Sequence, residues 1–222
     1  MKMVIVAGGS PPSKKLLLTE LTAKSLLIAA DGGANCLDKY QITPDYIIGD
    51  LDSISEIALN NATKKQVNIE RHLRDKDTSD ARLALAKALE FDPTQIIILG
   101  CLGGKRVDHL YNSFGLLDLC LTKKIKAAIK DDFQTIVLSA HSLKILNCKP
   151  STFSLQSYGS QVTNLSISGG KYLLHNYQLN PGDPLTLSNE FTKKPVTINF
   201  DDGKLLIFIN QNLSLDKIEF NI

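Results

Sequence analysis

The segment Ser25-Leu26-Leu27-Ile28-Ala29-Ala30-Asp31-Gly32-Gly33-Ala34-Asn35 decides the fold, because it joins an apolar run to a glycine turn and the start of a helix. Residues 25–30 are too few for a helix and are bounded by turn residues, which predicts a buried strand. Tyr46-Ile47-Ile48 leads in the same way into Gly49-Asp50-Leu51-Asp52-Ser53. Ligands of open α/β sheets bind beyond the carboxyl ends of the strands. We therefore expect Asp31, Asp50 and Asp52 at a ligand-binding edge of a sheet.

These three carboxylates would repel one another unless a cation neutralised them. A site made of carboxylate oxygens suits Mg²⁺, which proteins usually hold with one or two carboxylates plus substrate phosphates. The alternative is that Asp50 and Asp52 only shape a turn and cap a helix. Ser53-Ile54-Ser55-Glu56 is itself a capping box, so the helix predicted to follow does not need Asp52 as its cap.

Two further clusters repeat the combination of charge and helix start. Asp75-Lys76-Asp77-Thr78-Ser79-Asp80 precedes a helical pattern over 81–89, for which Asp77 or Thr78 is the predicted N-cap. Gly103-Gly104-Lys105-Arg106 follows a strand-like run at 96–99, and a helix is predicted to begin near Asp108. Glycines allow the backbone to approach a phosphate, and the basic residues and helix N-terminus supply positive charge. This third cluster therefore predicts an anion site.

The pattern of elements changes near residue 140. Before it, short apolar runs near 3–7, 26–30, 46–49, 96–100 and 126–130 alternate with helical patterns near 13–23, 34–40, 53–65, 78–90 and 108–123. Such alternation indicates an α/β domain with a parallel sheet, here residues 1–140. After it, strand-like runs at 152–156, 162–167, 185–187, 196–200 and 205–209 predict a small all-β sandwich, jelly-roll-like, over 141–222. Asp202-Gly203 between the last two runs predicts a hairpin.

Composition excludes several classes of protein. The chain has 222 residues, 43% of them hydrophobic, and a net charge of +2, which fits a globular protein without the electrostatic footprint of nucleic-acid binding. No run of eighteen apolar residues exists, so no membrane span is expected. The four cysteines have neither disulfide nor metal spacing, which predicts reduced thiols in a cytoplasmic protein.

Five motifs in one order resemble the bacterial thiamine pyrophosphokinase family. They are Asp-Gly-Gly-x-Asn from Asp31, Pro-Asp-x-x-x-Gly-Asp-x-Asp-Ser from Pro44, Lys-Asp-x-Ser-Asp from Lys76, Gly-Gly-x-Arg-x-Asp-His from Gly103, and Ser188-Asn189-Glu190-Phe191. The resemblance covers nearly the whole chain. It implies transfer of the diphosphate of ATP to the thiamine hydroxyl, giving thiamine diphosphate and AMP with Mg²⁺ as cofactor. It also implies a Rossmann-like ATP-binding domain, a β domain that supplies part of the vitamin pocket, and a homodimer with active sites shared between chains.

The resemblance also assigns roles to residues. Metal ligands are Asp50, Asp52 and Asp80, and the catalytic set is Asp52, Asp80 and Arg106. ATP-binding residues are Asp31, Gly32, Gly33, Asn35, Lys76, Asp77, Gly104, Arg106, Asp108 and His109. Thiamine-binding residues are Tyr172, Ser188 and Asn189. Ser79 stands where threonine is commoner, and Lys105 is an extra residue before Arg-x-Asp-His.

Several alternatives remain open at the level of sequence. Either Asp52 or Asp80 could take the proton of the thiamine hydroxyl. Tyr172 can equally be a half-buried strand residue, and Ser188 and Asn189 can simply turn the chain. Two rival functions are a metal-dependent phosphohydrolase acting on a nucleotide and a non-catalytic nucleotide- or vitamin-binding module.

Overall fold

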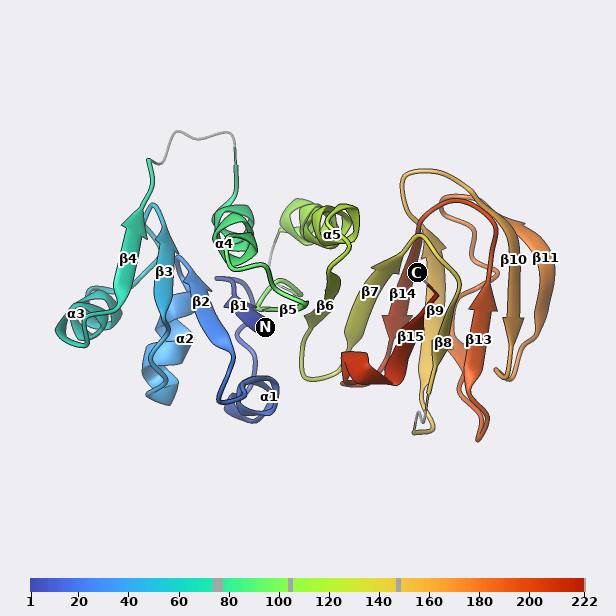
Figure 1. The fold of residues 1–222 in the computed structure, drawn as a ribbon, viewed down its shortest axis with the longest axis horizontal. Coiled ribbons are helices and arrows are strands. Elements are labelled where there is room, and N and C mark those ends of the chain that lie inside the picture. Colours follow the sequence, from blue (N-terminus) through green and yellow to red (C-terminus); the bar gives the residue numbers. More distant parts are fainter. Residues whose placement is uncertain (74–77, 104–105, 147–148, 222) are drawn as a thin grey trace. The chain divides into compact units, whose positions relative to one another are not determined.

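The computed structural model describes residues 1–73, 78–103, 106–146 and 149–221. The chain divides into two compact units, Met1–Asp132 and Phe133–Ile222 (Figure 1). The division lies eight residues before the position expected from the sequence, because strand β7 (Thr135–Ser139) belongs to the second unit. The two units are described separately.

The first unit contains a parallel sheet of six strands. These strands are β1 (Lys2–Val6), β2 (Leu26–Ala30), β3 (Tyr46–Gly49), β4 (Asn68–Arg71), β5 (Gln95–Leu99) and β6 (Lys126–Lys130). Their order is β6-β5-β1-β2-β3-β4, and every neighbouring pair is parallel. The chain moves outward from β1 to β4 and then returns to the other side of β1 as β5. The point where the direction reverses, between β1 and β5, is where parallel sheets bind ligands.

Helices cover both faces of this sheet. They are α1 (Lys14–Glu20), α2 (Gly33–Tyr40), α3 (Glu56–Lys64), α4 (Asp80–Leu89) and α5 (Val107–Thr122). Helices α4 and α5 lie on one face, and α1 and α2 lie on the other (Figure 1). Apart from the polar edge strand β4, the strands between them are rich in Val, Ile, Leu and Ala, and Ile5, Ile28 and Ile97 are fully buried. A near-continuous apolar run is what a strand needs when both of its faces are covered.

The expected helix caps need two corrections. Helix α3 is capped by Ser55, whose hydroxyl accepts a hydrogen bond from the Ala58 N–H, and not by Ser53 at the start of the predicted capping box. Helix α4 is capped by Ser79 in place of Asp77 or Thr78. In both cases a serine stands nearer the helix than the predicted cap and already has the extended backbone that an N-cap requires.

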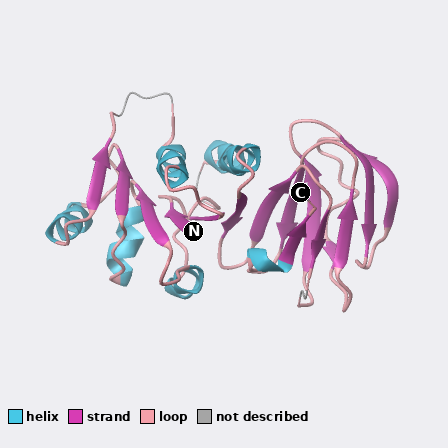
Figure 2. Ribbon diagram, in the orientation of Figure 1, coloured by secondary structure: helices cyan, strands magenta, loops and turns pink. Residues whose placement is uncertain are grey.

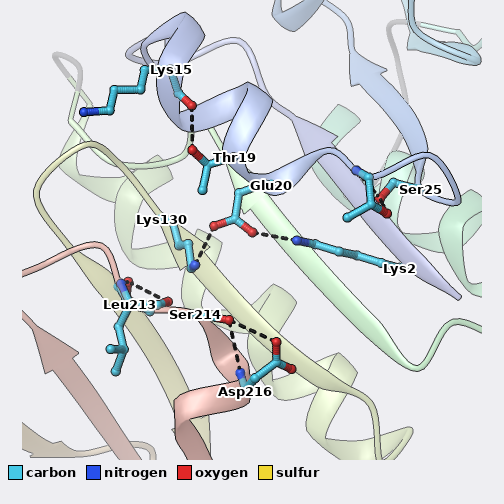
Figure 3. A network of polar contacts seen from close by, with 11 residues as sticks. Lys2, Lys15, Thr19, Glu20, Ser25, Lys130, Leu213, Ser214 and Asp216 are labelled. Atoms are coloured by element: carbon cyan, nitrogen blue, oxygen red, sulfur yellow. Dashed lines mark hydrogen bonds and ion pairs between the residues drawn. The ribbon is translucent and has the colours of Figure 1, made fainter. Parts of the chain in front are cut away.

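An ion triad at Glu20 ties helix α1 to strands β1 and β6 (Figure 3). The Lys130 ammonium has no exposed surface and lies 2.6 Å from Glu20 Oε1, while Lys2 Nζ lies 2.7 Å from Glu20 Oε2. Burial by itself would raise the pKa of Glu20, but the hydrogen bonds from Lys130 and Lys2 outweigh it and lower the pKa. Removing either lysine would leave a buried charge without full compensation, which is strongly destabilising.

The second unit consists of strands, with one short 3₁₀ turn at Leu215–Lys217 (Figure 2). One group has the order β12-β9-β14-β7, and the other has the order β11-β10-β13-β8-β15; all their pairs are antiparallel. Besides β7, the strands are β8 (Leu143–Ile145), β9 (Thr152–Ser157), β10 (Val162–Ser168), β11 (Leu174–Leu179), β12 (Asn189–Glu190), β13 (Val196–Asn199), β14 (Leu205–Ile209) and β15 (Ile218–Phe220).

Two expectations for the second unit are wrong. Asp202-Gly203 does not close a hairpin, because β13 pairs with β8 and β10 whereas β14 pairs with β7 and β9. The turn instead carries the chain from one sheet to the other, and Gly203 has a φ of 102° in close contact with the Gln161 carbonyl. Leu185–Leu187 forms a turn before β12 and not a strand. Leu185 and Leu187 are both exposed, so their alternation does not mark a core face.

Candidate functional site

Two loops of the first unit bring their acidic residues together. Asp31 follows β2, and Asp50 and Asp52 follow β3. Each of these residues offers a carboxylate oxygen, and the three oxygens lie within 4.8 Å of one another. Because neighbouring parallel strands end at the same edge of the sheet, loops far apart in sequence meet there. The acids predicted from the two glycine-containing motifs therefore do converge.

Gly49 makes this convergence possible. Its φ is 154°, and a Cβ at this position would lie 2.8 Å from Asp31 Cβ and 3.0 Å from Asp80 Oδ1. Any side chain here would push these two acids apart. Asp80, the first residue of α4, thus approaches the same point from a third element. Gly49 belongs to the motif that begins at Pro44, but the sequence assigned it no role of its own.

The environment of Asp31 disfavours the ionised form of its carboxyl group. It is 5% exposed, it has a φ of 43°, and its Oδ1 has no hydrogen-bond partner among the described residues. Burial raises the pKa of its carboxyl, and the charges of Asp80 and Asp50 raise it further, against hydrogen bonds from Ser53 and Gly32. An unsatisfied buried carboxylate oxygen beside other carboxylates has the chemistry of a cation site.

Two polar side chains hold backbone at opposite ends of β2 and β3, Asn35 beside the acidic loops and Asp45 at the start of the strands. Asn35 donates to the Ser53 carbonyl at 2.8 Å, and its Oδ1 accepts from the Ser55 N–H at 2.8 Å. Asp45 Oδ2 accepts from the Leu27 N–H at 2.8 Å, which ties the start of β3 to β2. Both residues belong to the sequence motifs, and here both hold backbone in place. Packing also requires a glycine at position 33, because a Cβ there would lie 2.0 Å from the Val6 carbonyl oxygen.

A cavity of about 690 Å³ opens at the switch point between β1 and β5. Its lining combines acids, glycine backbone and the N-terminal part of α5. The lining residues are Ala7, Gly8, Gly9, Ser10, Pro11, Ala30, Asp31, Gly32, Ser53, Ser79, Asp80, Ala81, Gly100, Cys101, Gly103, Arg106, His109, Leu110, Asn112, Ser113 and Leu116. Such a volume is typical of small-molecule sites.

Glycine loops form one wall of this cavity. The Gly9 N–H donates to the Gly100 carbonyl at 2.9 Å, and a Cβ on Gly9 would lie 2.5 Å from that oxygen. The loops after β1 and β5 can therefore touch only because Gly9 has no side chain. Gly8, Gly9 and Ser10 carried only a weak signal in the sequence, since they lack the Gly-x-Gly-x-x-Gly spacing.

Arg106 and His109 place basic groups at the same cavity. Arg106 precedes α5 and forms an ion pair with Asp108, with Nε 3.2 Å from Asp108 Oδ1. Both side chains are about two-thirds exposed, and the pairing lowers the pKa of Asp108. Surface pairs of this kind contribute little to stability. Arg106 can therefore exchange Asp108 for a phosphate at small cost. Three further predicted ATP-binding residues, Lys76, Asp77 and Gly104, lie outside the described residues.

The predicted vitamin-binding residues of the second unit lie side by side. Asn189 Oδ1 accepts from the Tyr172 N–H at 3.0 Å, and Asn189 Nδ2 donates to the Tyr172 carbonyl at 2.7 Å. Tyr172 is 56% exposed, whereas Asn189 is only 4% exposed. Ser188 adopts a φ of 55°, and its N–H donates to Ser154 Oγ at 2.9 Å. The three residues predicted from the sequence thus belong to one patch.

Two protein-family models match the chain, one within each unit. The family model "Thiamin pyrophosphokinase, catalytic domain" matches residues 17–129, and "Thiamin pyrophosphokinase, vitamin B1 binding domain" matches residues 140–205. The chain belongs to the thiamin pyrophosphokinase family. The resemblance inferred from the five motifs is confirmed, and so is the expectation of a thiamine diphosphokinase.

Individual relatives extend over nearly the whole chain. Thiamine pyrophosphokinase of Bacillus subtilis (strain 168) is 29% identical over 213 residues, which are 93% of this chain and 98% of the relative. A crystal structure of the thiamine pyrophosphokinase from Bacillus subtilis has a TM-score of 0.86 at 27% identity and covers 96% of this chain and 100% of its own. The thiamin pyrophosphokinase from Candida albicans, at 17% identity, shares the fold with a TM-score of 0.82 over 95% of this chain and 89% of its own.

The environment of Asp31 in this thiamin pyrophosphokinase family member leads to a stability prediction. A carboxyl whose pKa is raised by folding takes up protons on folding, so its contribution to stability falls as the pH rises through the raised pKa. Asp31→Asn removes this ionisation, and asparagine tolerates the positive φ. Without divalent cations, we expect the variant to melt about 2–4 °C above the unaltered protein at neutral pH. The difference should shrink toward acid pH in melting curves, and a lower melting temperature at neutral pH would contradict the prediction.

Among the described residues, none of the helices is long and apolar enough to cross a bilayer.

Proposed function

We propose that this chain transfers the terminal diphosphate of ATP to the hydroxyl of thiamine, giving thiamine diphosphate and AMP. The observation that carries the proposal is the juxtaposition of the acid cluster at Asp31, Asp50 and Asp52 with the cavity lined by Gly8, Gly9 and Arg106. The cluster suits a hard cation, and the glycine loops and the guanidinium suit phosphates. Membership of the family supplies the substrates.

Asp50, Asp52 and Asp80 would hold Mg²⁺, with Asp31 beside them. The unsatisfied Asp31 Oδ1 supports this assignment, because a cation would compensate the buried carboxylate. Bound there, Mg²⁺ would neutralise charge on the phosphate oxygens and on the departing AMP.

The protein's own groups position the reactants and move a proton. The thiamine hydroxyl oxygen forms a bond to the β-phosphorus, and the bond from that phosphorus to the AMP oxygen breaks. The hydroxyl proton passes to a carboxylate, and Asp80 is the better placed of the two candidates because it lines the cavity whereas Asp52 does not. Arg106 and His109, which line the cavity, hold the phosphates. The remaining predicted ATP contacts are Asp31, Gly32, Gly33, Asn35 and Asp108, together with Lys76, Asp77 and Gly104, which lie outside the described residues.

Incubation of the pure protein with ATP, Mg²⁺ and thiamine tests the proposal. AMP and thiamine diphosphate should appear in equal amounts, and neither should form without thiamine. Phosphate release without thiamine would favour the phosphohydrolase instead. Binding of both ligands with no product would favour the non-catalytic module.

The site residues of the second unit are proposed to serve thiamine. The Tyr172 ring is exposed, and aromatic faces attract cations such as the thiazolium of thiamine. Lys171 Nζ lies 5.2 Å from the centre of this ring, so the ring already makes a cation–π contact within the chain. The first unit would then be the Rossmann-like ATP- and Mg²⁺-binding domain, and the second unit a β-sandwich with the vitamin site.

A cytoplasmic location is proposed from the cysteines. Cys36, Cys101 and Cys120 are free. Burial raises the pKa of the Cys36 and Cys101 thiols to about 11 and that of Cys120 to about 12. These thiols stay protonated and unreactive, as suits a reducing compartment.

We propose further that the working unit is a homodimer whose sites combine the acidic loops of one chain with the second unit of the other. Exposed apolar side chains around the vitamin patch, namely Tyr172, Leu173, Leu185 and Leu187, support a partner surface. The assay uses thiamine well below its KM, where the Tyr172→Ala/Ser188→Ala chain by itself has little activity. An equal mixture of this chain with an Asp52→Asn chain should regain about a quarter of the unaltered activity, because half the dimers would carry one intact site. Mixtures that stay inactive while labelled subunits demonstrably exchange would contradict the shared site.

A further inference from the structure

The vitamin patch contains one residue whose geometry disagrees with the role that its motif implies. Asn189 is 4% exposed, and its amide already forms three hydrogen bonds. Its Oδ1 accepts from the N–H groups of Tyr172 at 3.0 Å and Glu190 at 2.8 Å, and its Nδ2 donates to the Tyr172 carbonyl at 2.7 Å. A side-chain amide has four hydrogen-bonding positions. Backbone groups occupy three of these positions on Asn189, and its side chain has almost no exposed surface left for a ligand.

The backbone around Asn189 is shaped to receive this amide. A Cβ on Gly170 would lie 3.0 Å from Asn189 Oδ1 and 3.3 Å from Nδ2, so a side chain there would crowd the amide. On its other edge, Asn189 pairs with Phe153 of β9, which is fully buried. The amide therefore has a single place to lie, between the core strand and the segment that carries Tyr172.

Tyr172 itself has few other constraints. It is 56% exposed, and Lys171 Nζ lies 5.2 Å from the ring centre. The N–H of the preceding Lys171 donates to the Glu190 carbonyl at 3.0 Å, while both backbone groups of Tyr172 are held by Asn189. The Asn189 side chain thus binds the Tyr172 N–H and carbonyl as a neighbouring strand would, although no strand pairs with Tyr172 there.

We infer that Asn189 is a positioning residue for the Tyr172 ring and does not itself contact thiamine. This inference rests on the proposed thiamine site. The amide fixes the backbone of Tyr172, which sets the direction of the exposed ring and so the affinity for a cationic aromatic substrate. Ser188, which is exposed and next in the chain, is left as the polar group able to reach the vitamin.

A double-mutant cycle tests this inference, with the KM for thiamine and kcat measured for each variant. Tyr172→Ala should raise the thiamine KM about tenfold. Asn189→Ala should raise it by a similar factor, with the KM for ATP and kcat changed less than about twofold. In the Tyr172→Ala background, Asn189→Ala should add less than about a further twofold, because the ring that it positions is gone. Factors that multiply to about a hundredfold would mean that Asn189 contacts thiamine independently, and would overturn the inference.

Two further variants separate positioning from loss of structure. Asn189→Asp keeps both accepted hydrogen bonds but replaces the donor to the Tyr172 carbonyl by an oxygen that repels it, so it should raise the thiamine KM, and its melting curve checks that the variant folds. Thr186→Val removes a hydrogen bond of a similarly buried residue, from Thr186 Oγ1 to the Leu155 carbonyl at 2.6 Å. It should lower the melting temperature without changing the thiamine KM. An equal rise in KM from Thr186→Val would reduce Asn189 to a general structural role and overturn the inference.

The proposed function and this inference fail in different ways. If the unaltered protein forms no thiamine diphosphate, the proposed function is overturned and the inference with it. If product forms but neither Tyr172→Ala nor Asn189→Ala changes the thiamine KM, the reaction stands and the inference is wrong.

Discussion

Asp52→Asn, like Asp50→Asn, is expected to lower the rate of thiamine diphosphate formation by more than about 10³-fold, because a metal held by carboxylates contributes several kcal/mol of charge stabilisation. Asparagine preserves the shape of each side chain and removes its charge. The Asx-type bond from the Asp52 N–H to Asp50 Oδ1, at 3.1 Å, can still form in both variants. Stability should therefore stay near that of the unaltered protein, or rise slightly as repulsion among the acids falls.

Steady-state rates and melting curves of the same samples check this prediction. Asp92→Asn is the matched control, since Asp92 is exposed, has a φ of 46° and lies outside the cavity lining. It should leave both quantities unchanged. A variant of Asp50 or Asp52 that keeps its activity but melts much earlier would show that these acids are structural.

Arg106→Ala should lower kcat by about 10²-fold or more, because a guanidinium that grips phosphate oxygens in two places stabilises charge that develops during transfer. Arg106→Lys should recover part of the loss, since lysine restores the charge but not the two-point geometry. The melting temperature should change little, as the pair with Asp108 is exposed. Tyr172→Ala should instead raise the thiamine KM and leave the dependence on ATP near normal.

Lys123→Ala provides the control for charge alone. Lys123 is an exposed cation at the opposite end of α5, about 26 Å along the helix axis from Arg106. Its removal changes the net charge by the same amount and should not change kcat. If Arg106→Ala and Tyr172→Ala shift the dependence on the same substrate, the assignment of phosphate to the first unit and vitamin to the second is wrong.

The first unit was largely predictable from the sequence. Its strands are short runs of buried aliphatic residues, and such runs are visible without knowledge of their neighbours. The edge strand β4 was missed because Asn68–Arg71 is polar and only partly buried, so it lacks the apolar run. The helix caps were misplaced by one or two residues because several serines and acids near each helix start satisfy the same local rule.

In the second unit, local sequence patterns predicted a wrong strand pairing and missed a strand. The Asp202-Gly203 turn has the right residues for a hairpin, but its flanking strands pair in different sheets. The choice of partner is set by packing across the unit, which a two-residue turn does not encode. Strand β11, with four of its six residues exposed or half-exposed polar side chains, gave no apolar alternation to detect.

The alternation of strands and helices, the acidic and glycine-rich loops and the family could all be predicted, because they depend on residue type and spacing along the chain. Which atoms each of these residues contacts became clear from the three-dimensional structure. It showed that Gly49 allows Asp31 and Asp80 to approach each other, and that the amides of Asn35 and Asn189 bind backbone. The physical reason is that a polar side chain bonds to whatever lies within about 3 Å of it in space, and that neighbour is fixed by long-range packing.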